Sequence, residues 1–280
     1  MASVDLHVHT SASDGFFAPR EVIYKAKKSG LSAIAITDHD TTDGLSEALA
    51  SLTAEDRFTI IPGVELSTDY ENQDIHILGY YMNYKEEGFQ NVLADFREKR
   101  SKRALEIVEK LNSLGYEINY EEILKIAKNS AVGRPHIASA LVSMGYTKNN
   151  SEAFDKLLKR GKPAYVPKHK ISPTEAVRFI RYFRGIPVIA HPGLAGKDHI
   201  IPVLVKAGLL GIEVYHSDHK LQDVLKYLNL AKRYGMLITG GSDFHGIEPT
   251  RKRVMGVPEL EMNTVIEMKN IKEKLENAIC

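Results

Sequence analysis

Histidines and carboxylates recur in this sequence where short apolar runs end. The stretch LHVHT places His7 and His9 two residues apart, and Asp14 follows five residues after His9. Residues two apart on a β-strand point to the same face, so both imidazoles can reach one metal ion. The same residues would also occur where a strand ends in a polar turn that has no binding or catalytic role. The pair alone leaves both interpretations open.

Further histidines and acids repeat this placement along the chain. The histidines in or near apolar runs are His39, His76, His191, His216 and His245, and the acids are Asp38, Asp40, Glu65 and Asp243. A solvated helix face would scatter such residues along helices, so the set favours a shared site. Imidazole and carboxylate without thiolate suit Zn, Mn or Fe. So many ligands predict two or three ions, a number suited to hydrolysis.

Composition excludes several other classes of protein. The net charge of +1 argues against a general nucleic-acid coat, although it leaves room for a local basic groove. Cys280 is the only cysteine, so neither a disulfide framework within the chain nor a thiolate cluster can form. We see no signal peptide and no apolar run of about 18 residues. We therefore expect a soluble, cytoplasmic protein without a membrane partner.

Seven short apolar runs predict β-strands, with amphipathic helical patterns between most of them. The predicted strands are Val4–His9, Ala33–Thr37, Thr59–Glu65, Ile75–Tyr81, Val188–His191, Gly211–Tyr215 and Leu237–Gly240. Alternation of strand and helix predicts an α/β protein with a parallel sheet. The pattern leaves a barrel and a doubly wound sheet open. In a barrel, the C-terminal strand ends gather on one face.

Residues 87–161 break this alternation, since helical patterns follow one another without a strand. They cover Phe89–Leu114, Tyr120–Ala127, Arg134–Met144 and Ser151–Arg160. We expect a helical insert at 87–161 between two parts of a barrel, 1–86 and 162–280. Within it, REKRSKR (97–103) could follow a nucleic-acid backbone. The acids Glu98 and Glu106 favour the solvated side of a long helix instead.

Six motifs resemble the PHP family of metal-dependent phosphoesterases, which is named for polymerase and histidinol phosphatase. They are DLHVHTSASDG (5–15), ITDHDTTDG (36–44), PGVELS (62–67), DIHILGY (74–80), AHPG (190–193) and GGSDFHG (240–246). The resemblance implies a distorted seven-stranded β/α barrel that carries up to three metal ions. This strand number agrees with the seven apolar runs.

The resemblance also implies a ligand set for each ion. His7, His9, Glu65 and Asp243 would hold the first; Glu65, His76 and His191 the second; and Asp14, His39 and His245 the third. All nine positions carry a fitting residue.

The segments VGRPHIA (132–138) and GKPAYVP (161–167) resemble motifs of a bacterial subgroup with a helical insert. That subgroup removes the 3′-phosphate from nucleoside 3′,5′-bisphosphates, and some members trim short RNA from the 5′ end. The resemblance implies that Arg134 grips a phosphate, as a guanidinium at a helix start can. Lys162 and Tyr165 would either touch substrate or hold the joint between insert and barrel. His216 would donate to a phosphate, protonate a leaving group or support a metal ligand.

Three other functions remain open. Histidinol phosphatase is the alternative within the family. An amidohydrolase-like C–N hydrolase would also begin with H-x-H, but the bridging lysine expected near the fourth strand is missing. An accessory binding module is the third, and the complete set of nine ligands argues against it.

Overall fold

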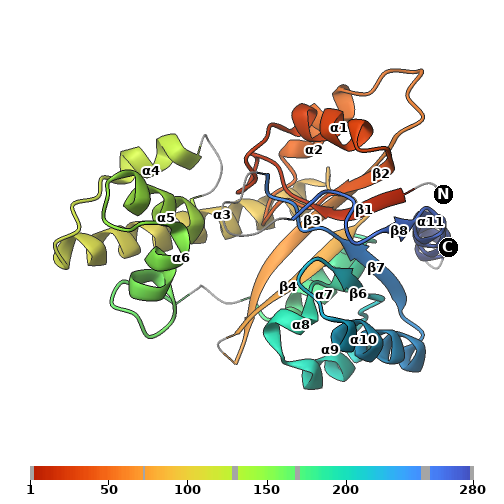
Figure 1. Ribbon diagram of the computed structural model, residues 1–280. Coiled ribbons are helices and arrows are strands. Elements are labelled where there is room, and N and C mark those ends of the chain that lie inside the picture. Colours follow the sequence, from red (N-terminus) through yellow and green to blue (C-terminus); the bar gives the residue numbers. More distant parts are fainter. Residues whose placement is uncertain (1–2, 72, 128–131, 168–170, 247–252, 278–280) are drawn as a thin grey trace.

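The structure is a computed structural model that describes residues 3–71, 73–127, 132–167, 171–246 and 253–277. Its centre is one curved sheet with the strand order β7-β6-β5-β4-β3-β2-β1-β8 (Figure 1). The strands are β1 (Ser3–Val8), β2 (Leu31–Ile36), β3 (Thr59–Tyr70), β4 (Gln73–Tyr80), β5 (Ile186–Ile189), β6 (Gly211–His216), β7 (Leu237–Gly241) and β8 (Leu260–Glu261). A bridge between Val8 and Phe244 joins β1 to the segment after β7, so the sheet is a nearly closed barrel.

The direction of β4 differs from the expected parallel sheet, because β4 runs antiparallel to both β3 and β5. Only two residues separate β3 from β4, which is too short for the crossover that parallel strands need. As a result the N-terminal half of β4 lies at the rim where the parallel strands end. The two-residue β8 was also not expected, and it pairs antiparallel with β1.

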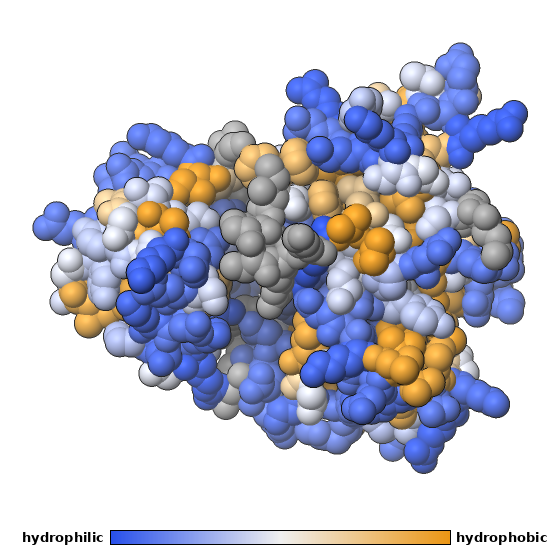
Figure 2. All heavy atoms as spheres, in the orientation of Figure 1, coloured by the Kyte–Doolittle hydropathy of each residue, from blue (hydrophilic) through white to orange (hydrophobic). Residues whose placement is uncertain are grey.

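Helices alternate with most of the strands, as the sequence predicts. They are α1 (Pro19–Lys28), α2 (Gly44–Ala50), α7 (Pro173–Tyr182), α8 (Pro192–Ala195), η2 (Asp198–Ile200), α9 (Ile201–Ala207), α10 (Leu221–Tyr234) and α11 (Asn263–Asn277). A capping box begins α7: the Ser172 hydroxyl accepts from the Glu175 N–H at 3.2 Å, and the Glu175 carboxylate accepts from the Ser172 N–H at 2.7 Å. Exposed apolar side chains gather over α10, where Leu221 and Leu225 lie one turn apart (Figure 2).

The segment after β4 is helical throughout, as expected, and lies beside the barrel (Figure 1). It comprises α3 (Glu87–Ser113), α4 (Tyr120–Ala127), α5 (Arg134–Ser143), α6 (Asn150–Ala153) and the π-helix η1 (Phe154–Leu158). Buried side chains from Ala104 to Val166 form a core of their own, whereas Phe89 and Leu93 at the start of α3 join the barrel core. The domain boundaries at 86/87 and 161/162 stay a prediction. No helix among the described residues is long and apolar enough to cross a membrane.

Candidate metal centre

The predicted ligands come together around the buried carboxylate of Glu65 on β3. Its Oε1 atom lies 2.7 Å from His76 Nδ1 and 3.1 Å from His191 Nε2. Its Oε2 atom lies 3.2 Å from His7 Nε2, 3.1 Å from His9 Nε2 and 3.2 Å from His39 Nδ1. One carboxylate therefore faces five imidazole nitrogens from four other segments of the chain. Such an arrangement suits an acid that bridges two cations.

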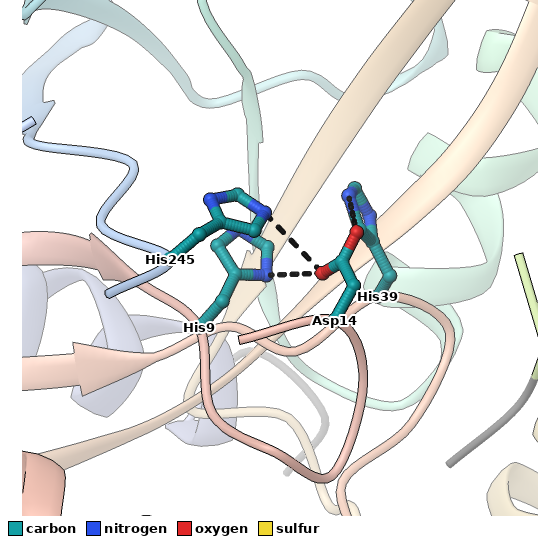
Figure 3. Close-up of side chains that lie close together, drawn as sticks. All are labelled: His9, Asp14, His39 and His245. Atoms are coloured by element: carbon teal, nitrogen blue, oxygen red, sulfur yellow. Dashed lines mark ion pairs between the residues drawn. The ribbon is translucent and has the colours of Figure 1, made fainter. Parts of the chain in front are cut away.

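Three overlapping groups can each hold an ion, because their ligand atoms lie within 4.8 Å of one another. They are His7, His9, Glu65 and Asp243; His39, Glu65 and His76; and His9, Asp14, His39 and His245. In the third group the Asp14 carboxylate points between the rings of His39 and His245 (Figure 3). Its oxygen atoms lie 3.2 Å from His245 Nε2 and 3.9 Å from His39 Nε2. His191 belongs to none of these three groups, although its Nε2 atom lies 3.1 Å from Glu65 Oε1 and its ring stacks on that of His7.

The unpaired atoms of the cluster fit metal ions. His7 Nε2, both ring nitrogens of His9, His39 Nδ1 and Glu65 Oε2 are buried and make no hydrogen bond. Leaving buried polar atoms unpaired costs about 1–3 kcal/mol each. All of these atoms face the shared centre, where a bound cation would satisfy several of them at once. The donor set of imidazole and carboxylate is the one that Zn, Mn and Fe prefer.

Without a cation, the cluster shifts the pKa values of its own members strongly. Burial lowers the pKa of His9, but Asp243 and Glu65 raise it by a larger amount, so that the pKa of His9 is about 10. Burial raises the pKa of Glu65, yet the surrounding histidines hold it well below its usual range. The pKa of Asp243 lies well below its usual range for the same reason. At neutral pH the metal-free protein therefore keeps the His9 ring protonated, and a metal ion that binds there must displace this proton.

The backbone near two ligands is held in an unusual conformation. His191 and Asp243 have φ angles of +28° and +53°, in the region that side-chain-bearing residues rarely adopt. Such strain persists where the surrounding structure enforces it, and it is concentrated at functional sites. Gly241 permits the close packing of β7 on β1, because a Cβ there would lie 2.4 Å from the Cβ of His7.

Two residues that support the cluster were missed by the sequence analysis. Glu213 on β6 is fully buried, accepts a hydrogen bond from His7 Nδ1 at 3.0 Å and accepts the His191 N–H at 2.7 Å. Arg253 donates to the Asp243 carboxylate and, at 2.8 Å, to Asp218. A glutamate inside the predicted strand Gly211–Tyr215 was the available signal for the first. Nothing in the local sequence marks Arg253.

A cavity of about 450 Å³ lies between the cluster and the helical segment. Asp14, His39 and His76 line it from the barrel. Lys99, Arg100, Arg103 and Arg134, which we call the basic wall, line it from α3 and α5. The interpretation of REKRSKR as a solvated face was therefore wrong for Arg100 and Arg103, which are 16% and 8% exposed, whereas Lys99 lines the cavity and is still 44% exposed. Helical spacing places Phe96, Lys99, Arg100 and Arg103 on the same side of α3.

The ion pairs of the basic wall reach across to the barrel. Arg134 lies 2.9 Å from the Asp74 carboxylate, and Arg100 lies 3.3 Å from that of Asp40. Arg103 is buried and donates to the Val166 carbonyl at 2.9 Å. Lys99 pairs with Asp95 of the same helix at 2.6 Å. The wall thus carries four cations against three paired acids, which leaves it one net positive charge.

The remaining predicted substrate residues lie elsewhere or are covered. Lys162 and Tyr165 are not among the residues that line this cavity. His216 is 3% exposed; its Nδ1 atom accepts the Asp218 N–H at 3.1 Å, and its Nε2 atom lies 3.5 Å from Asp243. It therefore contacts a ligand of the cluster rather than the cavity.

Comparison with known proteins gives the family. A family model described as PHP domain matches residues 5–169, so the chain belongs to the PHP family. The chain is 36% identical to a 3′,5′-nucleoside bisphosphate phosphatase of Chromobacterium violaceum, over 88% of each protein. It is 32% identical to the 5′-3′ exoribonuclease Rnm of Salmonella typhimurium, over 86% of this chain and 84% of that protein.

A solved structure agrees with this fold. It is that of a predicted metal-dependent phosphoesterase from Bifidobacterium adolescentis, which superposes with a TM-score of 0.87 at 31% identity. The match covers 96% of both chains, so it includes the barrel and the helical segment.

Proposed function

We propose that this chain is a metal-dependent hydrolase of nucleotide phosphate esters that removes the 3′-phosphate from nucleoside 3′,5′-bisphosphates. Short 5′-phosphorylated RNA is a second substrate of the same site. Two relatives support this choice, since one is a 3′,5′-nucleoside bisphosphate phosphatase and the other a 5′-3′ exoribonuclease, and both align with most of this chain. The single cysteine and the nucleotide substrates support a cytoplasmic location.

One observation carries the choice of a substrate with two phosphates. The cavity has a cluster suited to cations on one side and the basic wall on the other. A phosphate that is hydrolysed belongs at the cations, because they neutralise its developing charge. The basic wall then remains for a second phosphate of the same molecule. A substrate with one phosphate, such as histidinol phosphate, would leave the basic wall with only the acids of the protein itself, Asp40, Asp74 and Asp95.

Two or three divalent ions, from among Mn, Zn and Fe, would be held by the nine predicted ligands. These nine ligands are His7, His9, Asp14, His39, Glu65, His76, His191, Asp243 and His245. When bound, such ions activate water near neutral pH and stabilise negative charge on the phosphate.

The other residues bind and position the substrate. Arg134 begins α5 and lines the cavity, so its guanidinium can donate to a phosphate there. Arg100 and Lys99 add positive charge from α3. His216 positions Asp243 through its Nε2 atom, and its burial leaves solvent water to protonate the departing alkoxide.

A panel of substrates tests this function. With Mn²⁺ present, we expect phosphate release from adenosine 3′,5′-bisphosphate at a higher kcat/KM than from histidinol phosphate. A short 5′-phosphorylated RNA should be shortened from its 5′ end. Ammonia release from amide substrates, without phosphate release from any ester, would favour C–N hydrolysis instead and contradict the proposal.

A further inference from the structure

The carboxylate of Glu213 lies behind the cluster and away from the cavity. It is fully buried on β6, and it is not one of the nine predicted ligands. Its two oxygen atoms have different partners. Oε1 lies 3.0 Å from His7 Nδ1, and Oε2 accepts the backbone N–H of His191 at 2.7 Å.

The partner of Oε1 decides which nitrogen of His7 carries the proton. An ionised carboxylate only accepts hydrogen bonds, so it requires a proton on His7 Nδ1. In the neutral ring that binds a metal ion, the opposite nitrogen, Nε2, then keeps its lone pair. It faces Glu65 and Asp243 at 3.2 Å and 3.5 Å. A ring nitrogen must be free of its proton to bind a metal ion.

The partner of Oε2 holds the second element in place. His191 follows β5 with a φ angle of +28°, and its ring reaches Glu65 Oε1. A backbone N–H can only donate, so this contact requires an acceptor oxygen whatever happens at His7. Glu213 therefore ties the ligand from β1 to the ligand after β5.

We propose that Glu213 is a positioning residue that fixes the tautomer of His7 for metal binding while it anchors the strained turn at His191. The inference rests on the proposed metal site. It predicts a specific result for Glu213→Gln, which keeps the shape of the side chain. The amide oxygen must stay with the His191 N–H, so the NH₂ group faces His7 Nδ1. That nitrogen then becomes the acceptor, and the proton moves to Nε2, where it blocks the metal.

The first test is calorimetric titration of metal-free protein with Mn²⁺. We expect Glu213→Gln to weaken Mn²⁺ binding about 10- to 100-fold, the range found when the partners of ligating histidines are removed. Asp5→Asn is the matched control. Asp5 is a buried carboxylate on β1. It accepts from the backbone N–H groups of His7, Ser242 and Gly256 and from the Ser242 hydroxyl rather than from an imidazole. We expect this variant to unfold at a lower temperature with Mn²⁺ affinity within about threefold of wild type.

The second test reads the proton directly and needs no variant. Long-range ¹H–¹⁵N spectra of Zn²⁺-loaded wild-type protein should show the His7 proton on Nδ1. A proton on Nε2 in that spectrum overturns the inference, as does equal Mn²⁺ affinity of wild type and Glu213→Gln. An equal loss of Mn²⁺ affinity in Asp5→Asn would also overturn it, because the loss in Glu213→Gln would then not depend on the contact with His7. If wild type itself takes up no Mn²⁺, the proposed metal site fails rather than the role of Glu213.

Discussion

Arg134 gives the sharpest test of the basic wall. We consider Arg134→Met, which keeps an unbranched side chain against the ring of Phe154, 5.7 Å from the guanidinium in the structure. The Arg134–Asp74 pair is partly exposed, with side chains 19% and 40% accessible. Such a pair contributes at most about 1 kcal/mol to folding. The variant should therefore fold with a stability close to that of wild type.

The expected loss is in substrate binding. A hydrogen bond to a charged group contributes about 1.5–3 kcal/mol, which corresponds to about 10- to 150-fold. We expect kcat/KM on adenosine 3′,5′-bisphosphate to fall by this factor, mainly through KM. Adenosine 3′-monophosphate lacks the second phosphate, so its kcat/KM should change by less than about threefold.

The matched control is Lys102→Met on α3. Lys102 is 67% exposed, pairs with Glu98 and does not line the cavity. Its replacement therefore removes a positive charge from the same helix without changing the cavity. Its kinetics on both substrates should equal those of wild type. Equal losses on the two substrates in Arg134→Met would refute the assignment of the basic wall to the phosphate that is not hydrolysed.

Three further predictions concern the cluster itself. His9→Ala should lower kcat/KM by about 10³-fold, yet circular dichroism should show a folded protein, because the variant loses only the pairs of His9 with Glu65 and Asp243 while the strands and the other ligands remain; wild-type turnover would contradict the role of His9. In metal-free protein the His9 proton stabilises the fold fully below pH 6.5, and this contribution is lost as pH rises toward about 10, at about 1.4 kcal/mol per pH unit. The melting temperature of the metal-free protein should thus fall between pH 7 and 9, while the stabilisation by Mn²⁺ grows. A difference in melting temperature between Mn²⁺-loaded and metal-free protein that does not increase with pH would contradict this. Gly241→Ala should cost about 1–3 kcal/mol in urea denaturation, since its Cβ would lie 2.4 Å from that of His7; an unchanged midpoint would show that β1 and β7 can separate.

The positions of most ligands could be predicted because they follow buried strands in the sequence. The ends of parallel strands meet at one rim, and this brought His7, His39, His191 and Asp243 together. The direction of β4 could not be predicted from its apolar run, since such a run carries no direction. His76 nevertheless reaches Glu65, because antiparallel pairing sets it opposite Ser67, two residues along β3.

The supporting residues depend on contacts that no local pattern contains. Glu213 meets His7 across 206 positions of sequence, and only the closure of the barrel brings them together. Part of the basic wall does follow a local pattern, because Lys99, Arg100 and Arg103 recur at helical spacing within REKRSKR. Its mixed charges concealed that one side of α3 faces a cavity rather than water.

The proposed function requires that Glu65 and the residues around it bind divalent ions. Anomalous diffraction from crystals of the wild-type protein grown with Mn²⁺ tests this binding. We expect at least two peaks flanking the Glu65 carboxylate, one beside His7, His9 and Asp243 and one beside His76. A map without a peak in this cluster, at a Mn²⁺ concentration that supports full phosphate release in solution, would contradict it.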